Sequence, residues 1–179
     1  TGISVLRFGT EYWYAWTKSR YNQYNSSLAD HFKAVFSEAD LYITNDLAAK
    51  AGLRAEHSSL IDKINLAPRI SLAYKTGKNE QVSLAYGIFY QKPENMHLFQ
   101  STDMDYAGAT HYIANYQKMN KDYTFRAEIY YKKYHGLVKT TPTITNNGSG
   151  YAQGLEIFWR DKKTVNYKGY RQLSHLGME

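Results

Sequence analysis

Residues 82–91 read Val-Ser-Leu-Ala-Tyr-Gly-Ile-Phe-Tyr-Gln, and every second position, beginning with the valine, carries a large apolar or aromatic side chain. Successive side chains of a β-strand point to opposite faces, so this period of two predicts a strand with one apolar face. One face carries Val82, Leu84, Tyr86, Ile88 and Tyr90, and the other carries Ser83, Ala85, Gly87, Phe89 and Gln91.

The same period recurs along most of the chain. We therefore predict an all-β protein, an antiparallel meander of about eight long strands. The length of these strands and the connections between them indicate that the meander is part of a transmembrane β-barrel. Several of these strands approach the ~9–11 residues that a tilted strand needs to cross a bilayer. Residues 48–53 also allow a short helix, because alanine favours helices. The expected strands are residues 6–16, 34–44, 49–56, 69–74, 82–91, 111–117, 123–132 and 154–160.

The connections between these strands alternate in length. Short polar turns are expected at residues 44–46, 75–80 and 119–122. Between them lie longer polar segments at residues 17–31, 57–65, 92–108 and 137–150. Tight turns at one end and long loops at the other are typical of outer-membrane barrels. We predict one β-barrel segment over residues 1–164, followed by an irregular tail at 165–179, where the alternation is lost.

The composition fits this prediction. The chain has 179 residues, of which 43% are hydrophobic and 16% aromatic, including 18 tyrosines, which argues against disorder. The mean hydropathy is −0.60, and no apolar run approaches the ~20 residues of a spanning helix. A transmembrane β-barrel is compatible with this low hydropathy, because its lipid-facing residues alternate with polar ones. The absence of cysteine removes disulfides, thiolate metal sites and cysteine nucleophiles.

Two sets of side chains define the expected faces. Aromatic residues near the strand ends suggest membrane-interface girdles, although tyrosines also pair across ordinary antiparallel sheets. Charged residues of both signs on the other face suggest a lumen, although a solvated surface would look alike. The candidate interface aromatics are Tyr14, Trp16, Tyr74, Tyr86, Tyr90, Tyr123, Tyr131 and Trp159. The candidate lumen-facing residues are Arg7, Glu11, Glu38, Asp40, Lys50, Arg54, Glu56, Arg69, Arg126, Glu128, Glu156 and Arg160.

The order of segments is similar to that of a known family. Residues 36–44 and 47–58 resemble barrel hairpins of TonB-dependent outer-membrane receptors from Bacteroides-type bacteria. Residues 66–74, 82–93 and 154–157 look like further strands of the same barrels, so that the resemblance covers roughly residues 3–164.

This resemblance implies a location in the bacterial outer membrane. Such receptors are barrels of about 22 strands filled by an amino-terminal plug. They import a bulky nutrient such as a siderophore, cobalamin, a glycan or a peptide, with energy supplied by TonB. The implied partners are outer-membrane lipid, the remainder of the barrel, the plug and, through the plug, TonB.

The chain also departs from the family pattern. No plug and no TonB-contacting box are present in the sequence, and about eight strands cannot enclose a plugged lumen. We therefore expect a piece of the barrel wall or a truncated relative of such a receptor. Two alternatives stay open: a complete eight-stranded membrane barrel with a structural or adhesive role, and a soluble β-sheet binding module.

Catalytic, metal and cofactor motifs are not found, and we expect no enzyme. The six histidines lack HxH or HExxH spacing, and His57-Ser58-Ser59 lacks a GxSxG elbow. Glu38 and Asp40 could act as an acid/base pair, but ion pairing with Arg54 is the favoured role. The formal charge of +6 suits a polyanion such as nucleic acid or lipopolysaccharide. The basic residues are scattered, however, and we expect no nucleic-acid partner.

Overall fold

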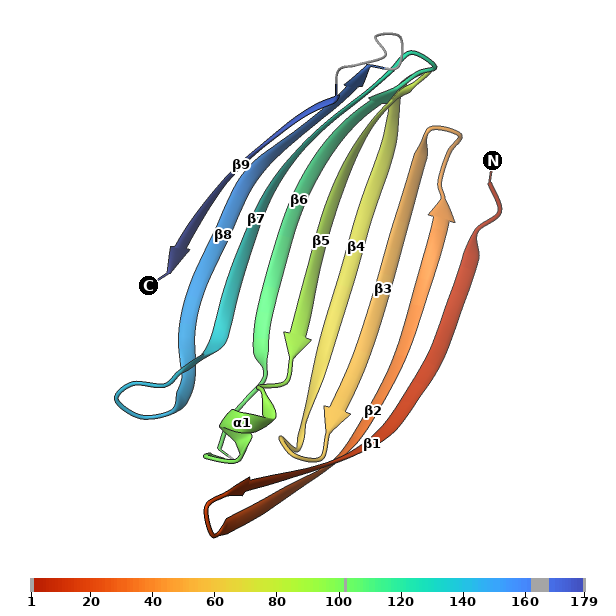
Figure 1. Cartoon of the computed structure of the whole chain (residues 1–179). Coiled ribbons are helices and arrows are strands. Elements are labelled where there is room, and N and C mark those ends of the chain that lie inside the picture. Colours follow the sequence, from red (N-terminus) through yellow and green to blue (C-terminus); the bar gives the residue numbers. More distant parts are fainter. Residues whose placement is uncertain (1, 102, 162–167, 179) are drawn as a thin grey trace.

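The computed structural model describes residues 2–101, 103–161 and 168–178 (Figure 1). The described residues form one antiparallel sheet and a single short helix, α1, at Asn95–Leu98. The strands are β1 (Val5–Tyr21), β2 (Tyr24–Tyr42), β3 (Leu47–Ser58), β4 (Lys63–Gly77), β5 (Glu80–Gln91), β6 (Ala107–Met119), β7 (Tyr123–Lys139), β8 (Thr145–Asp161) and β9 (Lys168–Met178). Residues 48–53, which also allowed a short helix, lie within β3.

Each strand pairs only with its neighbours in the sequence, in the order β1 to β9. Figure 1 shows the sheet as one curved layer, with β1 and β9 at opposite edges. The predicted antiparallel meander is confirmed, with nine strands instead of about eight. Within the described residues, β1 and β9 do not pair, so the sheet does not close on itself.

The prediction of an irregular tail at residues 165–179 is wrong for most of its length. Residues 168–178 form β9, which pairs with β8 from Arg160↔Lys168 to Gly150↔Met178. The pairing uses backbone groups, and the exposed edge of β8 offers unpaired N–H and C=O groups whatever the side-chain pattern of its partner. Residues 165–167 and 179 lie outside the described part of the chain.

The connections between the strands lie at two opposite ends of the sheet, as the sequence predicts. The turns at residues 43–46, 78–79 and 120–122 form one end, which we call the turn end, at the top of Figure 1. The connections at residues 22–23, 59–62, 92–106 and 140–144 form the opposite end, the loop end.

The expected lengths of the loop-end connections are wrong in three of four cases. Only residues 92–106 form a long loop. Residues 17–31 belong mostly to β1 and β2, which meet in a turn of two residues at Asn22 and Gln23. Most of the segments 57–65 and 137–150 likewise lies in strands. A strand with water on both sides needs no apolar face, so its sequence shows no alternation and looks like a loop.

Side-chain oxygens organise two of the turns. The Thr44 hydroxyl accepts hydrogen bonds from the amides of Asp46 and Leu47, at 3.1 and 2.9 Å. The Asn120 side-chain oxygen accepts from the amides of Asp122 and Tyr123, at 2.9 and 2.8 Å. These side chains satisfy backbone donors that the strand ladders leave free, which explains the preference for such residues in tight turns.

Very few apolar side chains are buried. The buried ones gather near the loop end, where the 92–106 loop and α1 lie against the strands: Ala34, Ile61, Ala67, Leu98, Met104 and Tyr106. The rest of the sheet has no second layer among the described residues, and large side chains such as Phe8 and Ile64 are 81% and 71% exposed. No helix in the described residues is long and apolar enough to cross a membrane.

Candidate functional site

The cross-strand register gives the sheet one apolar face. Residues directly opposite each other on paired strands share a face. The pairings Ile70↔Tyr86, Tyr86↔Tyr112 and Tyr112↔Tyr131 therefore put these side chains together. The same register places all eight candidate interface aromatics on this side, which we call the apolar face. That they lie at a membrane interface stays a prediction.

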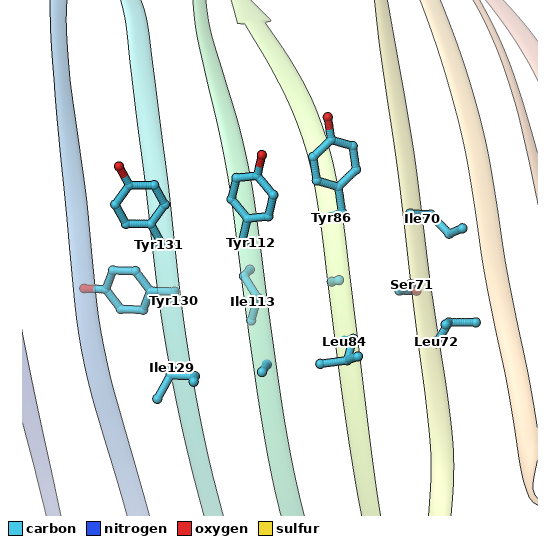
Figure 2. Close-up of a pocket in the computed structure, with 12 residues that line it drawn as sticks. Ile70, Ser71, Leu72, Leu84, Tyr86, Tyr112, Ile113, Ile129, Tyr130 and Tyr131 are labelled. Atoms are coloured by element: carbon cyan, nitrogen blue, oxygen red, sulfur yellow. The ribbon is translucent and has the colours of Figure 1, made fainter.

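Four tyrosines form a row across the apolar face. The ring centroids of Tyr86 and Tyr112 are 5.3 Å apart, those of Tyr112 and Tyr131 6.3 Å, and those of Tyr131 and Tyr151 6.2 Å. Figure 2 shows the hydroxyls of Tyr86, Tyr112 and Tyr131 pointing the same way along the strands, toward the end where β5 finishes, which is the loop end. Tyr112 and Tyr151 were not among the aromatics that the sequence singled out.

The spacing of aromatics on β7 and β8 fits the thickness of a bilayer. Tyr123 and Tyr131 are eight residues apart on β7, and Tyr151 and Trp159 are eight apart on β8. At ~3.3 Å per residue this is about 26 Å along the strand, or about 20 Å of height for a strand tilted by ~40°. Membrane barrels have an apolar band about 25 Å tall between two aromatic girdles.

Polar residues bound the apolar face at both ends. Toward the loop end the register places Lys33, His57 and Lys133 on it, and the strands continue beyond them. Neither Lys33 nor Lys133 has a carboxylate partner in the described part of the chain. Toward the turn end Lys118 pairs with Glu80, at 2.6 Å. The apolar face therefore carries a neutral ion pair toward the turn end and, toward the loop end, lysines without a carboxylate partner among the described residues, beyond which Tyr14 and Trp16 of β1 continue the face. We call the part of the face between these lysines and the ion pair the apolar band.

The opposite face carries the charges. The pairings Arg7↔Glu38, Glu38↔Gly52 and Gly52↔Arg69 put residues of β1 to β4 on one side of the sheet. The chain of pairs then runs through β5 and β6 to β7 and β8. All twelve candidate lumen-facing residues share this side, which we call the charged face. That it lines a lumen stays a prediction.

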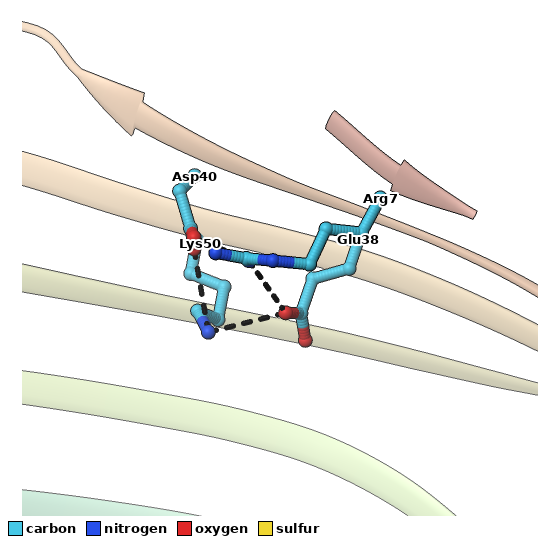
Figure 3. Close-up of polar contacts among 4 residues, drawn as sticks. All are labelled: Arg7, Glu38, Asp40 and Lys50. Atoms are coloured by element: carbon cyan, nitrogen blue, oxygen red, sulfur yellow. Dashed lines mark hydrogen bonds and ion pairs between the residues drawn. The ribbon is translucent and has the colours of Figure 1, made fainter. Parts of the chain in front are cut away.

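A network of two acids and two bases crosses β1 to β3 near the turn end (Figure 3). Arg7 contacts Asp40 at 2.5 Å and Glu38 at 3.4 Å, and Lys50 contacts Glu38 at 3.1 Å and Asp40 at 3.3 Å. The expected pairing of Glu38 and Asp40 with Arg54 is wrong. The register explains this, because Arg7 lies opposite Glu38 and Lys50 lies opposite Asp40.

Arg54 holds two other acids on the same face. Its guanidinium donates two hydrogen bonds to the Glu11 carboxylate, at 2.8 and 3.2 Å, and its Nε donates to Glu56 at 3.0 Å. A planar guanidinium is suited to such two-point binding of a carboxylate. The acids and bases of β1 to β3 thus largely neutralise one another.

The charged face over β4 to β7 has a different character. Arg69 lies 4.5 Å from the Phe89 ring, His111 packs on the same ring at 4.6 Å, and Lys132 lies 4.9 Å from Tyr130. Among the described residues, none of these bases forms an ion pair with an acid, and neither do Arg126 and Arg160.

The two remaining acids among the candidate lumen-facing residues lie on β7 and β8. Glu128 accepts a hydrogen bond from Asn115 at 3.2 Å, and its register partner is Glu156. A depression of about 180 Å³ lies between Lys50, Arg69 and His111, where Gly52 and Gly87 lack side chains. This half of the charged face presents positive charge and aromatic rings.

A buried carboxylate fastens the 92–106 loop. Asp30 is 1% exposed, and it accepts hydrogen bonds from Lys92 at 2.5 Å and from Ser58 at 2.7 Å. Asp30 lies beyond Lys33 on β2, outside the apolar band. Burial by itself raises the pKa of Asp30, but the hydrogen bonds from Lys92 and Ser58 outweigh it, and the pKa lies below its ordinary value.

Further contacts join the same loop to distant strands. Asn95 donates to the Thr17 hydroxyl at 3.1 Å, and Lys63 contacts Asp105 at 2.6 Å. The hydrogen bond from Lys63 lowers the pKa of Asp105. Sequence reasoning missed Asp30 and Lys92, because a lone acid in a polar segment carries no signal of burial or of a partner 62 residues away.

In residues 2–101, 103–161 and 168–178, no group of three or more His, Cys, Asp or Glu side chains could hold a metal ion. The chemistry of the surface therefore lies in its two faces. One face can contact apolar material over a band of limited height. The other presents charges of both signs to water or to a polar partner.

Comparison with known proteins adds information about the fold. The sequence matches no protein-family model and no curated protein. Among solved structures, a mutant of the ferric enterobactin receptor PfeA of Pseudomonas aeruginosa in complex with enterobactin is similar, with a TM-score of 0.84 at 11% identity over 97% of this chain and 33% of that chain. The siderophore receptor PirA of the same organism gives 0.76 at 13% identity, over 97% of this chain and 36% of its own.

A third structure, the ferric-catecholate import receptor Fiu of Escherichia coli, gives a TM-score of 0.68 at 14% identity, over 87% of this chain and 29% of its own. The chain thus spans about a third of the length of the structures it matches. At these identities the likeness concerns the fold. The chain folds as a segment of the wall of a transmembrane β-barrel.

Proposed function

We propose that the chain is a barrel-wall portion of a TonB-dependent outer-membrane receptor that takes up a bulky nutrient. The observation that supports this most is the two-faced meander, which has one apolar band and one charged face and is similar to known receptor barrels over nearly the whole chain. In this proposal the chain is not an enzyme, and its location is the bacterial outer membrane.

Each face has a role in this proposal. The apolar face contacts outer-membrane lipid, since a band of exposed Leu, Ile and Tyr is stable only where water is excluded. The charged face lines the lumen and meets the plug, which in turn contacts TonB. The unpaired bases over β4 to β7 favour an acidic surface on the plug at this part of the wall. The Bacteroides-type origin stays a prediction.

The proposal for the nutrient rests on the ligands for which the similar solved structures are named. The similar structures are named for ferric enterobactin, for siderophores and for ferric catecholates. Of siderophores, cobalamin, glycans and peptides, we therefore propose a siderophore. The loop end, with its long strands and the fastened 92–106 loop, faces the outside of the cell, because tight turns lie on the periplasmic side of such barrels.

The two alternatives fit the structure less well. A complete small barrel needs its first and last strands to pair, whereas β1 and β9 lie at opposite edges. A soluble binding module needs a second layer over the apolar face, whereas Leu84 is 53% exposed and Ile129 56% exposed.

Two experiments test the proposal in the full-length receptor. This chain has no cysteine, so in a full-length receptor from which any other cysteines have been removed, single cysteines introduced at Leu84 and at Lys50 report on the two faces separately. We expect a water-soluble maleimide to label the cysteine at 50 and a lipid-soluble one to label the cysteine at 84. Heat-modifiable migration on a gel and recovery in the outer-membrane fraction are also expected. A receptor found in the soluble fraction would overturn the proposal.

The transport step needs its own measurement. Deleting the receptor gene is expected to abolish uptake of one radiolabelled ferric siderophore, and restoring the gene is expected to recover it. Uptake that is unchanged for every ferric siderophore tested, with a correctly inserted receptor, would overturn the choice of nutrient and leave the barrel assignment standing.

A further inference from the structure

The part of the β1–β2 hairpin nearest the loop end extends beyond the rest of the sheet. β1 and β2 pair as far as Tyr21↔Tyr24, whereas the pairing of β2 with β3 ends at Phe32↔Ser58. Residues 14–31, which we call the hairpin arm, therefore have no third strand paired along them among the described residues. Figure 1 shows the arm bending across the loop end toward α1. A two-stranded ribbon is marginally stable by itself, so the arm needs other contacts to keep one orientation.

Residues 92–98, which include α1, supply these contacts, and we call them the bracing segment. The Asn95 side-chain amide donates a hydrogen bond to the Thr17 hydroxyl at 3.1 Å, and the Lys92 ammonium donates one to the Asp30 carboxylate at 2.5 Å. Thr17 belongs to β1 and Asp30 to β2. Two contacts on different strands fix the orientation of the arm, whereas a single contact would act as a pivot.

The arm is covered on one side. The register places Thr17 opposite Leu28, and both side chains are half-buried. They share their side of the arm with Asp30, which is 1% exposed. On the other side Trp16 is 58% exposed. The arm therefore meets the bracing segment with its charged-face side, and its apolar-face side is exposed.

The base of the arm is bonded to the strand and the turn beside it. Asp30 also accepts a hydrogen bond from Ser58 on β3, at 2.7 Å. The amide of His31 donates to the Ser59 hydroxyl at 2.8 Å, and the amide of Ser59 donates to the His31 carbonyl oxygen at 3.2 Å. A hinge needs residues that absorb a change of φ and ψ, and glycine, which does so most readily, is absent from the arm. Rotating the arm about its base would break these bonds together with the two contacts to the bracing segment.

The bracing segment is itself anchored in the wall. Leu98 is 2% exposed, and Pro93 is buried as well. Farther along the same loop, Asp105 contacts Lys63 of β4 at 2.6 Å, and the Asp105 carbonyl oxygen accepts a hydrogen bond from Asn146 of β8 at 2.7 Å. The parts of a protein that move are those with few buried contacts. The bracing segment does not belong to that class.

We infer that the hairpin arm and the bracing segment form a fixed brace across the loop end, which keeps one position while the ligand binds and passes. The inference rests on the proposed function, because it requires the loop end to be the outer mouth of the barrel. A fixed brace gives this mouth a constant outline on the side of β1 and β2. The opposing arrangement is a lid, in which the arm swings outward each time a ligand enters.

A reversible crosslink between the arm and the bracing segment distinguishes the brace from the lid. Thr17→Cys and Asn95→Cys are introduced together into a full-length receptor from which any other cysteines have been removed, and a bis-methanethiosulfonate reagent joins them in whole cells. We expect the crosslinked receptor to take up the radiolabelled ferric siderophore as fast as the same receptor after reduction. A loss of uptake that the reductant reverses would show a lid and overturn the inference. Two cysteines that fail to react together would overturn it as well.

The matched control crosslinks the arm to itself. Ser19 and Ser26 lie opposite each other on β1 and β2, so Ser19→Cys and Ser26→Cys are joined by the same reagent without tying the arm to the loop. Uptake by this variant is expected to stay unchanged. The control separates the restraint between arm and loop from the chemical modification itself.

Nitroxide labels measure the position of the arm without a crosslink, and they decide the case in which the reagent lowers uptake in both variants. The labels are attached to cysteines at Gln23, in the turn of the arm, and at Gln100, just after α1, both of which are exposed. We expect one distance between the labels, unchanged when the ferric siderophore is added. Lys92→Met, which removes the contact to Asp30, is expected to broaden the distance distribution, and Lys33→Met, on the other face, is not. A second distance that appears with the ligand would overturn the inference whatever the crosslinks show.

Heat-modifiable migration and uptake by the unmodified receptor check the proposed function on the same samples. An unmodified receptor that does not insert or does not transport overturns the proposed function, and the inference fails with it. A transporting receptor whose arm moves overturns the inference alone.

Discussion

Arginine placed on the two sides of one strand is expected to have opposite consequences. Leu84 and Ser83 are adjacent on β5, and the register puts Leu84 on the apolar face and Ser83 on the charged face. We predict that Leu84→Arg destabilises the receptor in a membrane and that Ser83→Arg does not. Ser83 lies opposite Ala73 and Asn115, whose small side chains leave room for arginine.

The size of the effect follows from the depth of Leu84. Leu84 is four residues from Glu80, which borders the apolar band, so it lies about 13 Å along the strand and about 10 Å into a band that is about 25 Å tall. This is close to the midplane, where an arginine on the lipid face costs about 2–4 kcal/mol. A cost of about 3 kcal/mol corresponds to about a 150-fold shift of the folding equilibrium. If the face lay in water, replacing an exposed leucine would change the free energy of unfolding by about 0.5 kcal/mol or less.

Urea titration of the receptor refolded into lipid vesicles measures these free energies. Leu84→Ala serves as a third variant, because it removes the leucine without adding a charge. A cost of Leu84→Arg no greater than that of Leu84→Ala would refute the assignment of this face to lipid. A large cost of Ser83→Arg combined with a neutral Leu84→Arg would show that the two faces are interchanged.

Three further perturbations test the loop end and the backbone. Lys92→Met leaves the buried carboxylate of Asp30 without its cation, and the free energy of opening the 92–106 loop is expected to fall by about 3 kcal/mol. In limited proteolysis this loop should then be cut faster. Lys92→Arg, which keeps the positive charge, should protect the loop. Because the pKa of Asp30 is lower in the folded chain than in the unfolded one, its contribution is fully present above the unfolded pKa and is lost as the pH falls through the folded value. An acid-active protease should therefore begin to cut the loop below about pH 4, and a loop equally protected at pH 2 and pH 5 would contradict this. Gly136→Ala is expected to cost more than about 1 kcal/mol, because Gly136 has a φ of +66° and a Cβ there would lie 2.8 Å from the Tyr106 carbonyl oxygen. Gly77→Ala, where the nearest atom is 3.6 Å away, should change the melting temperature little, and equal shifts for both variants would argue against the strain at Gly136.

The sequence predicts the middle of the strands well and their ends poorly. In residues 82–91 the alternation arises because the two faces meet different surroundings, and it predicts both β5 and the face of each side chain. In residues 17–31 the strands β1 and β2 continue, although the sequence shows no such contrast there. Where both faces meet similar surroundings, the alternation disappears while the backbone pairing persists.

The contacts within each face could be predicted only in part. The sequence puts Glu38, Asp40 and Arg54 on the charged face, but the choice of partner depends on a register that no single strand contains. The attachment of the 92–106 loop depends on Asp30 and Lys92, which are far apart in the sequence. The hollow on the apolar face at β6 forms because the small side chain of Ala114 lies between the larger side chains of Leu84 and Ile129, and these neighbours come from the register.

Each strand pairs only with its immediate neighbours in the sequence. This pattern bears on how strands can be added to such a wall. In a meander of this kind, inserting or deleting one hairpin changes the pairing of the two flanking strands only, and all the other strands keep their original partners and register. Duplication of a hairpin would change the circumference of a closed barrel by two strands and would not require new contacts elsewhere. Gene duplication at the scale of about 30 residues is thus a route by which barrels of different width could arise from one ancestral wall.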